Sequence, residues 1–302
     1  MTTSCRRPQA EAGCRVRRRV PPQSNALFAR PWHPPRMCHD ADSHPPELPA
    51  DLRPAPIAGG ALETRDLVLT VPDGNRLRGF EARAPHPTGG GVVIFPDWRG
   101  LGQFYEELAM RFAEAGYDAV AFDYFGRSAG TDPHPADFDQ MPHLAKTTPE
   151  GIAADAAAAA DHLRRTGRVR ALAVLGFCFG GRNALLQALP DSSIRPAAVI
   201  SFYGQLGPDR SGRGGPLSVA DHFVRPILGH YGGADEGIPV GQVEELGRAL
   251  SSAGVSHEIH VYPNATHSFF DRRHQEFAAE ADQAWRRTIA FLGRTLAASP
   301  AD

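Results

Sequence analysis

Residues 171–181, ALAVLGFCFGG, decide the fold. The run 171–175 is short and apolar, which is typical of a strand buried on both faces of a sheet. Gly176-Phe177-Cys178-Phe179-Gly180 comes next, and we predict a helix over about 180–189. A nucleophile with a glycine two positions away on either side, between a strand and a helix, is the nucleophile-elbow pattern, here with cysteine in place of serine. The pattern predicts Cys178 as a nucleophile.

The elbow explains both glycines and favours a reactive thiol. A sharp strand-to-helix turn brings neighbouring backbone segments close together, so the residues at Gly176 and Gly180 must be small. Backbone N–H groups and the helix dipole at a helix N-terminus stabilise a thiolate. The alternative interpretation is a buried, inert cysteine in a glycine-rich turn.

Strands alternate with helices on both sides of this turn, which predicts an α/β fold. Such alternation implies right-handed crossovers and a mainly parallel sheet, here of about eight strands, with helices on both faces. An initial hairpin would lie at one edge. The predicted strands are 67–71, 76–80, 91–95, 119–122, 171–175, 197–202, 226–229 and 258–262, and the predicted helices are about 103–115, 149–165, 180–189, 239–253 and 275–297.

An elbow requires an acid and then a histidine later in the chain. Asp235 follows the predicted strand 226–229, although it could merely cap the next helix, and Glu236 is the alternative acid. His267 lies on a loop between the last strand and the last helix, which is the expected position of the base. We therefore predict that Cys178, Asp235 and His267 form a triad.

Two backbone N–H groups are expected to form the oxyanion hole. One belongs to Phe179, directly after the nucleophile, and the other belongs to Trp98, in the loop after strand 91–95. Asp97 lies in the same loop, where its carboxylate could accept or orient the thiol proton of Cys178. The alternative is that Asp97 only caps the loop.

The first 60 residues differ from the rest in composition. They hold 11 of the 27 prolines and show no periodicity, so we predict a largely disordered tail followed by one domain over 61–302. Met37 is a possible alternative translation start. The arginines near the N-terminus precede no apolar run, so no signal peptide is expected. No 18-residue apolar run occurs, and the net charge is −2. Three of the four cysteines fall in the first 38 residues and no C-x-x-C pair occurs, which is compatible with a reducing cytoplasm.

Over residues 61–298 the chain resembles the dienelactone hydrolase family of the α/β-hydrolase superfamily. The segments that carry the resemblance are Gly176–Gly181, Gly232–Asp235 and His267–Phe269. The resemblance implies that Cys178, His267 and Asp235 act on a cyclic enol ester. Family members place a glutamate where this chain has Asp97. They also place a substrate-binding arginine four residues after the histidine, where this chain has Asp271, and Arg272 follows it.

Two long connections, 126–148 and 204–222, could line the substrate pocket or be plain surface loops. The candidate substrate-binding residues are Phe125, His143, Tyr203 and Arg272. We therefore predict a cysteine-dependent hydrolase of a lactone or enol ester that works through a thioester. No metal, cofactor, nucleic acid or membrane is implied, and the protein is expected to be a cytoplasmic monomer or small homo-oligomer. The alternatives are a general carboxylesterase or thioesterase, and a non-catalytic ligand-binding protein.

Overall fold

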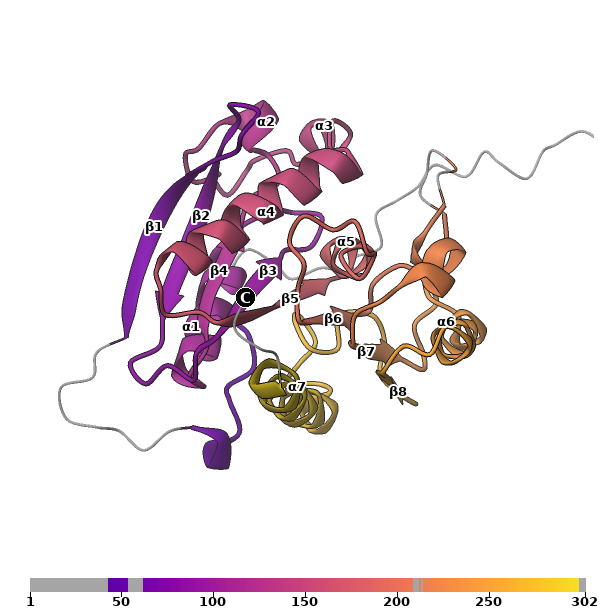
Figure 1. The fold of residues 1–302 in the computed structure, drawn as a ribbon. Helices are drawn as coiled ribbons and strands as arrows, with labels where there is room; N and C mark the ends of the chain where they lie inside the picture. Colours follow the sequence, from indigo (N-terminus) through magenta and orange to yellow (C-terminus); the bar gives the residue numbers. More distant parts are fainter. Residues whose placement is uncertain (1–42, 54–61, 209–211, 213, 299–302) are drawn as a thin grey trace, which may run out of the picture. The chain divides into compact units, whose positions relative to one another are not determined.

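A sheet of eight strands forms the centre of the described chain (Figure 1). The computed structural model describes residues 43–53, 62–208, 212 and 214–298. The strand order is β1-β2-β4-β3-β5-β6-β7-β8. The strands are β1 (Glu63–Thr70), β2 (Arg76–Arg83), β3 (Gly90–Phe95), β4 (Asp118–Phe122), β5 (Ala171–Phe177), β6 (Ala198–Phe202), β7 (Ile227–Gly232) and β8 (His257–Tyr262).

The sheet is parallel except at one edge. β1 pairs antiparallel with β2, and β2 pairs antiparallel with β4, whereas the strands from β4 to β8 pair in parallel. The predicted hairpin is therefore β1–β2 and lies at the edge. The predicted α/β class, with about eight mainly parallel strands, is confirmed.

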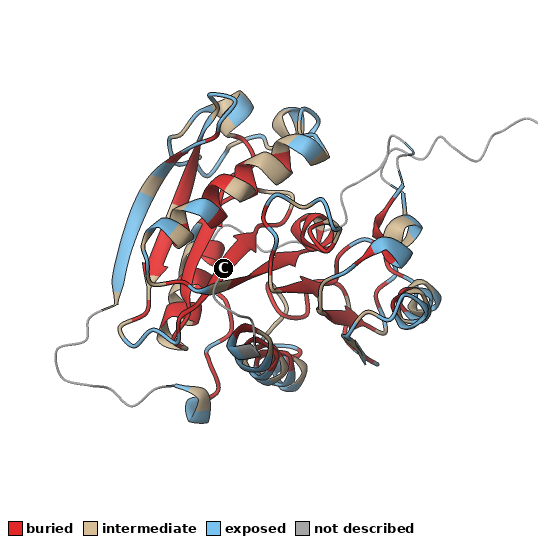
Figure 2. Cartoon of the chain, viewed as in Figure 1, coloured by how far each residue is buried: buried red, intermediate tan, exposed pale blue. Residues whose placement is uncertain are grey.

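Helices cover both faces of the sheet, which is why its central strands read as continuous apolar runs. Every residue of β3 to β7 is buried except Ala171, the first residue of β5 (Figure 2). α4 and α5 lie on one face, and α1 and α7 lie on the other (Figure 1). The longer helices are α1 (Gln103–Glu114), α4 (Pro149–Arg165), α5 (Phe179–Leu186), α6 (Val240–Ser252) and α7 (Ala278–Ala298).

The two long connections contain short helical turns that the sequence did not predict. Segment 126–148 holds α2 (Gly126–Ala129) and α3 (Met141–Leu144), each four residues long. Segment 204–222 ends in the 3-10 helix η2 (Pro216–His222). Helices of four to seven residues are too short to show the apolar periodicity on which sequence prediction depends.

Residues 43–53 fall within the predicted N-terminal tail and contact α7. This segment contains the 3-10 helix η1 (Ala50–Leu52), and Leu48 is 1% exposed. The Trp285 indole N–H donates to the Pro46 carbonyl at 3.0 Å, and Arg286 pairs with Asp51. The partners lie more than 200 residues away, so no local pattern reveals them. The rest of the predicted tail lies outside the described residues.

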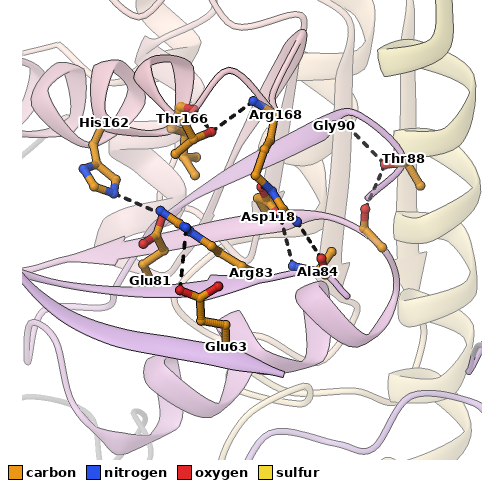
Figure 3. A network of polar contacts seen from close by, with 12 residues as sticks. Glu63, Glu81, Arg83, Ala84, Thr88, Gly90, Asp118, His162, Thr166 and Arg168 are labelled. Atoms are coloured by element: carbon orange, nitrogen blue, oxygen red, sulfur yellow. Dashed lines mark hydrogen bonds and ion pairs between the residues drawn. The ribbon is translucent and has the colours of Figure 1, made fainter. Parts of the chain in front are cut away.

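A buried carboxylate joins the antiparallel edge to α4. Glu81 on β2 is 1% exposed. Its carboxylate accepts from Arg65 at 2.6 Å and from His162 at 3.1 Å, and it forms an ion pair with Arg83 at 3.2 Å (Figure 3 labels Glu81, Arg83 and His162). Burial raises the pKa of Glu81, but the hydrogen bonds from His162, Arg65 and Arg83 outweigh it and lower the pKa to about 2.

We expect Glu81→Gln to lower the free energy of unfolding, and the difference from wild type to be larger at neutral pH than in acid. Because the folded-state pKa lies below the ordinary value of 4.5, the ionised carboxylate stabilises the fold above about pH 4.5 and this contribution is lost as pH falls toward 2. The shift corresponds to about 3 kcal/mol, of which about 2 kcal/mol is lost by pH 3.

Urea unfolding of wild type and variant at pH 7 and pH 3 measures this difference. The control is Glu63→Gln, because Glu63 also pairs with Arg83 but its side chain is 64% exposed, so it is expected to change stability little. A wild-type advantage over Glu81→Gln that is equal at the two pH values would contradict the prediction.

Candidate active site

Cys178 occupies the sharp turn between β5 and α5. Its backbone has φ 52° and ψ −113°, a strained conformation for a residue with a side chain. A Cβ atom on Gly176 would lie 2.2 Å from the Gly180 carbonyl oxygen, and one on Gly180 would lie 2.1 Å from the Pro96 carbonyl oxygen. The turn therefore needs glycine at both positions, and it places Cys178, which is 8% exposed, at the carboxyl ends of the parallel strands.

His267 and Asp235 come from the loops after β8 and β7 and form a buried pair. His267 Nδ1 lies 2.7 Å from Asp235 Oδ2, and the residues are 5% and 6% exposed. Asp235 Oδ1 accepts the Gly237 N–H at 2.8 Å, so this carboxylate both holds the histidine and closes its own turn. Glu236, the alternative acid, is exposed.

The charge state of His267 follows from its neighbours. Burial lowers the pKa of His267, but the negative charge of Cys178, the hydrogen bonds with Asp235 and Cys178, and the charge of Asp235 together raise it well above its usual range. A protonated His267 beside Cys178 is therefore favoured. An imidazolium next to a thiol is the arrangement that makes a cysteine nucleophilic at neutral pH.

Residues 96–101, which we term the oxyanion loop, follow β3 and are held by hydrogen bonds at several points. The Tyr105 hydroxyl accepts the Asp97 N–H at 2.8 Å, and the Tyr124 hydroxyl donates to the Pro96 carbonyl at 2.6 Å. Within the described chain, no residue accepts a hydrogen bond from the N–H of Trp98 or of Phe179. Both donors are thus available to a ligand.

Asp97 is fully buried in this loop. Its Oδ1 accepts the Arg99 N–H at 2.8 Å, which is the loop-capping role that the sequence left open. Burial raises the pKa of Tyr124 well above its usual range, and the negative charges of Asp97, Asp123 and Cys178 add to the effect. The Asp97 carboxylate and the Cys178 thiol therefore lie around the same tyrosine.

Tyr203 and Asp271 support the loop that carries His267. The Tyr203 hydroxyl donates to Asp271 Oδ2 at 2.8 Å, and both residues are fully buried. The Tyr203 ring centroid lies 4.8 Å from that of His267. Arg272 is partly buried and its backbone N–H donates to Asp271 Oδ1. Tyr203, a candidate substrate-binding residue, thus packs against the ring of His267.

Phe125 and His143, the other candidate substrate-binding residues, are in ring contact; Phe125 directly precedes segment 126–148 and His143 lies within it. Phe125 is fully buried and its ring centroid lies 6.0 Å from that of His143. His143 Nδ1 lies 2.9 Å from the Ser128 hydroxyl. These two residues come together through the fold.

Sequence reasoning missed four residues that position this site: Tyr105, Tyr124, Asp123 and Arg182. Arg182 on α5 is 7% exposed and donates to the carbonyls of Gly207 and Gly214, which attaches segment 204–222 to α5. Asp123 could have been identified by the argument used for Asp235, because it directly follows a buried parallel strand. The other three carried no local signal.

The described residues contain no group of three or more His, Cys, Asp or Glu residues that could hold a metal ion. None of their helices is long and apolar enough to cross a membrane.

Comparison with known proteins places the chain in a family. The model of the dienelactone hydrolase family matches residues 77–296. A carboxymethylenebutenolidase of Rhodococcus opacus is 31% identical over 273 residues, covering 88% of this chain and 100% of the relative. An Escherichia coli K12 protein named "Putative carboxymethylenebutenolidase" is 31% identical over 262 residues, covering 79% of this chain and 92% of the relative.

A solved structure agrees with this assignment. The "Putative Dienelactone Hydrolase from Klebsiella pneumoniae" superposes with a TM-score of 0.66 and 26% identity, covering 77% of this chain and 99% of that one. The chain therefore belongs to the dienelactone hydrolase family and is a hydrolase that acts on carboxylic ester bonds.

Proposed function

We propose that this protein hydrolyses a lactone or enol ester, with Cys178 as the nucleophile and a thioester as the intermediate. The observation that carries the proposal is the position of Cys178 in the elbow, hydrogen-bonded to a His267 whose other nitrogen is 2.7 Å from Asp235. The name of the Rhodococcus opacus relative, carboxymethylenebutenolidase, supports a lactone as the substrate class.

The first half-reaction acylates the thiol. The Cys178 thiolate attacks the carbonyl carbon, and the resulting oxyanion accepts hydrogen bonds from the N–H groups of Phe179 and Trp98. The intermediate collapses, the C–O bond breaks, and the His267 imidazolium gives its proton to the departing oxygen. In a lactone the departing oxygen stays in the acyl group, so the ring opens without release of a fragment.

The second half-reaction frees the thiol. His267, now neutral, takes a proton from water, and the hydroxide attacks the thioester carbonyl. The C–S bond breaks, the carboxylic acid is released, and the thiolate–imidazolium pair is restored. Asp235 holds His267 in the tautomer that this cycle needs. Asp97 is proposed to assist the thiol to ionise, since its carboxylate is buried close by.

The leaving group limits the substrate class. A thiolate expels an enolate or phenolate more readily than an amine, so lactones, enol esters and aryl esters are favoured over peptides. Asp271 supports a second candidate, a general carboxylesterase or thioesterase. The family's substrate-binding arginine is replaced by this buried carboxylate, which is held by Tyr203 and the Arg272 N–H.

A substrate panel with trapping of the acyl-enzyme tests the proposal. We expect turnover of a dienelactone or of p-nitrophenyl acetate, and an acyl adduct on the peptide that contains Cys178 after rapid acid quench. A higher kcat/KM for the lactone supports the first candidate, and a higher value for simple esters supports the second. Ligand binding without turnover of any ester would overturn both.

A further inference from the structure

Asp123, at the end of β4, joins two segments that are far apart in the sequence. Its carboxylate is 1% exposed. Asp123 Oδ1 accepts the N–H of Leu101, the last residue of the oxyanion loop, at 3.3 Å. Asp123 Oδ2 lies 2.8 Å from His134 Nε2, in segment 126–148. Because a carboxylate oxygen accepts, the His134 Nε2 carries the proton of this bond.

The oxyanion loop also rests directly on this carboxylate. Gly100 has φ 82°, and a Cβ atom there would lie 2.5 Å from Asp123 Oδ1 and 2.9 Å from the Phe125 ring. Only glycine allows such a close approach. Movement of Asp123 or Phe125 would therefore displace the backbone next to the proposed oxyanion donor Trp98.

Segment 126–148 reaches the same two residues through a stack of rings. The His134 and Phe138 rings are stacked with centroids 3.9 Å apart and planes 5° apart, and Phe138 stacks on His143 at 4.9 Å. The centroids of all three rings lie within 6.0 Å of that of Phe125. The segment thus contacts Asp123 through a hydrogen bond and Phe125 through ring contacts.

We propose that His134 is a positioning residue for catalysis: through the buried Asp123 carboxylate, segment 126–148 holds the oxyanion loop in the geometry that stabilises the tetrahedral intermediate. This inference rests on the proposed function of the loop. Transition-state stabilisation depends on donors placed in advance, and a displacement of about 1 Å can cost about 100-fold in rate. Segment 126–148 consequently sets the acylation rate as well as covering Phe125.

The test compares His134→Ala with wild type in two reactions of the same thiol. We expect His134→Ala to lower the acylation rate constant with p-nitrophenyl acetate about 10- to 100-fold, with KM changed less than about threefold, since the oxyanion forms only in the transition state. Alkylation of Cys178 by iodoacetamide forms no tetrahedral oxyanion, so its rate is expected to stay within about twofold of wild type. His134→Gln retains an N–H donor and should recover part of the acylation rate.

His162→Gln is the matched control, because it breaks another histidine–carboxylate pair. This pair joins His162 to the buried Glu81, and both residues are far from the oxyanion loop in the sequence. This control is expected to lower thermal stability and leave the acylation rate unchanged. An acylation rate in His134→Ala equal to wild type would overturn the proposal, as would an equal fall in acylation and alkylation. If wild type forms no acyl-enzyme at all, the proposed function fails instead, so the two failures are distinguishable.

Discussion

Cys178→Ala is expected to lower kcat for p-nitrophenyl acetate and for a dienelactone by at least about 10⁴-fold, because the thiolate that we propose forms the thioester is removed. The proposed oxyanion donors Phe179 and Trp98 are backbone groups and remain in the variant. Residual activity above the uncatalysed rate is therefore expected to come from these donors and from substrate binding. Steady-state kinetics with both substrates measures the loss.

The other cysteines of the chain provide a control for this experiment. Its other cysteines are Cys5, Cys14 and Cys38, and all three lie before residue 43, where the described structure begins. A triple alanine variant at these positions is expected to keep wild-type kcat and to lose activity when iodoacetamide alkylates Cys178. Full activity of Cys178→Ala would show that the thiol is not the nucleophile.

Asp235→Asn is expected to lower kcat about 10³- to 10⁴-fold with only a small change in KM. An asparagine at this position presents either a neutral oxygen or an N–H group to His267 Nδ1, and the N–H group would favour the unproductive tautomer. The carboxylate now makes the 2.7 Å contact that orients the ring. Kinetics with p-nitrophenyl acetate measures the effect, and a kcat within tenfold of wild type would contradict the role of Asp235.

The same variant should shift the pH dependence of thiol alkylation. The hydrogen bond and charge of Asp235 help to raise the pKa of His267, so their loss lowers that pKa and fewer imidazolium–thiolate pairs exist at neutral pH. The iodoacetamide profile of Cys178 is expected to move to higher pH. Glu236→Gln is the matched control, because Glu236 is adjacent but exposed, and its profile should overlay that of wild type.

The sequence alone predicted the class of fold and the candidate triad of Cys178, Asp235 and His267, because both depend on local patterns. Buried parallel strands read as apolar runs, as in β3 and β5. The elbow is a turn of five residues, and its glycines are required by contacts within the turn and with the oxyanion loop. Asp235 and His267 were predicted as triad members from their place after parallel strands, which bring their following loops to the same edge of the sheet.

Only the tertiary structure decided which distant residues support these groups. The Trp285 N–H donates to the Pro46 carbonyl, the Tyr203 hydroxyl donates to Asp271, and Asp123 connects Leu101 to His134. Each of these contacts joins residues that different strands and loops supply, and each needs only one hydrogen bond or one buried side chain. A single contact of this kind produces no periodicity and no spacing along the chain, so the packed fold is what creates it.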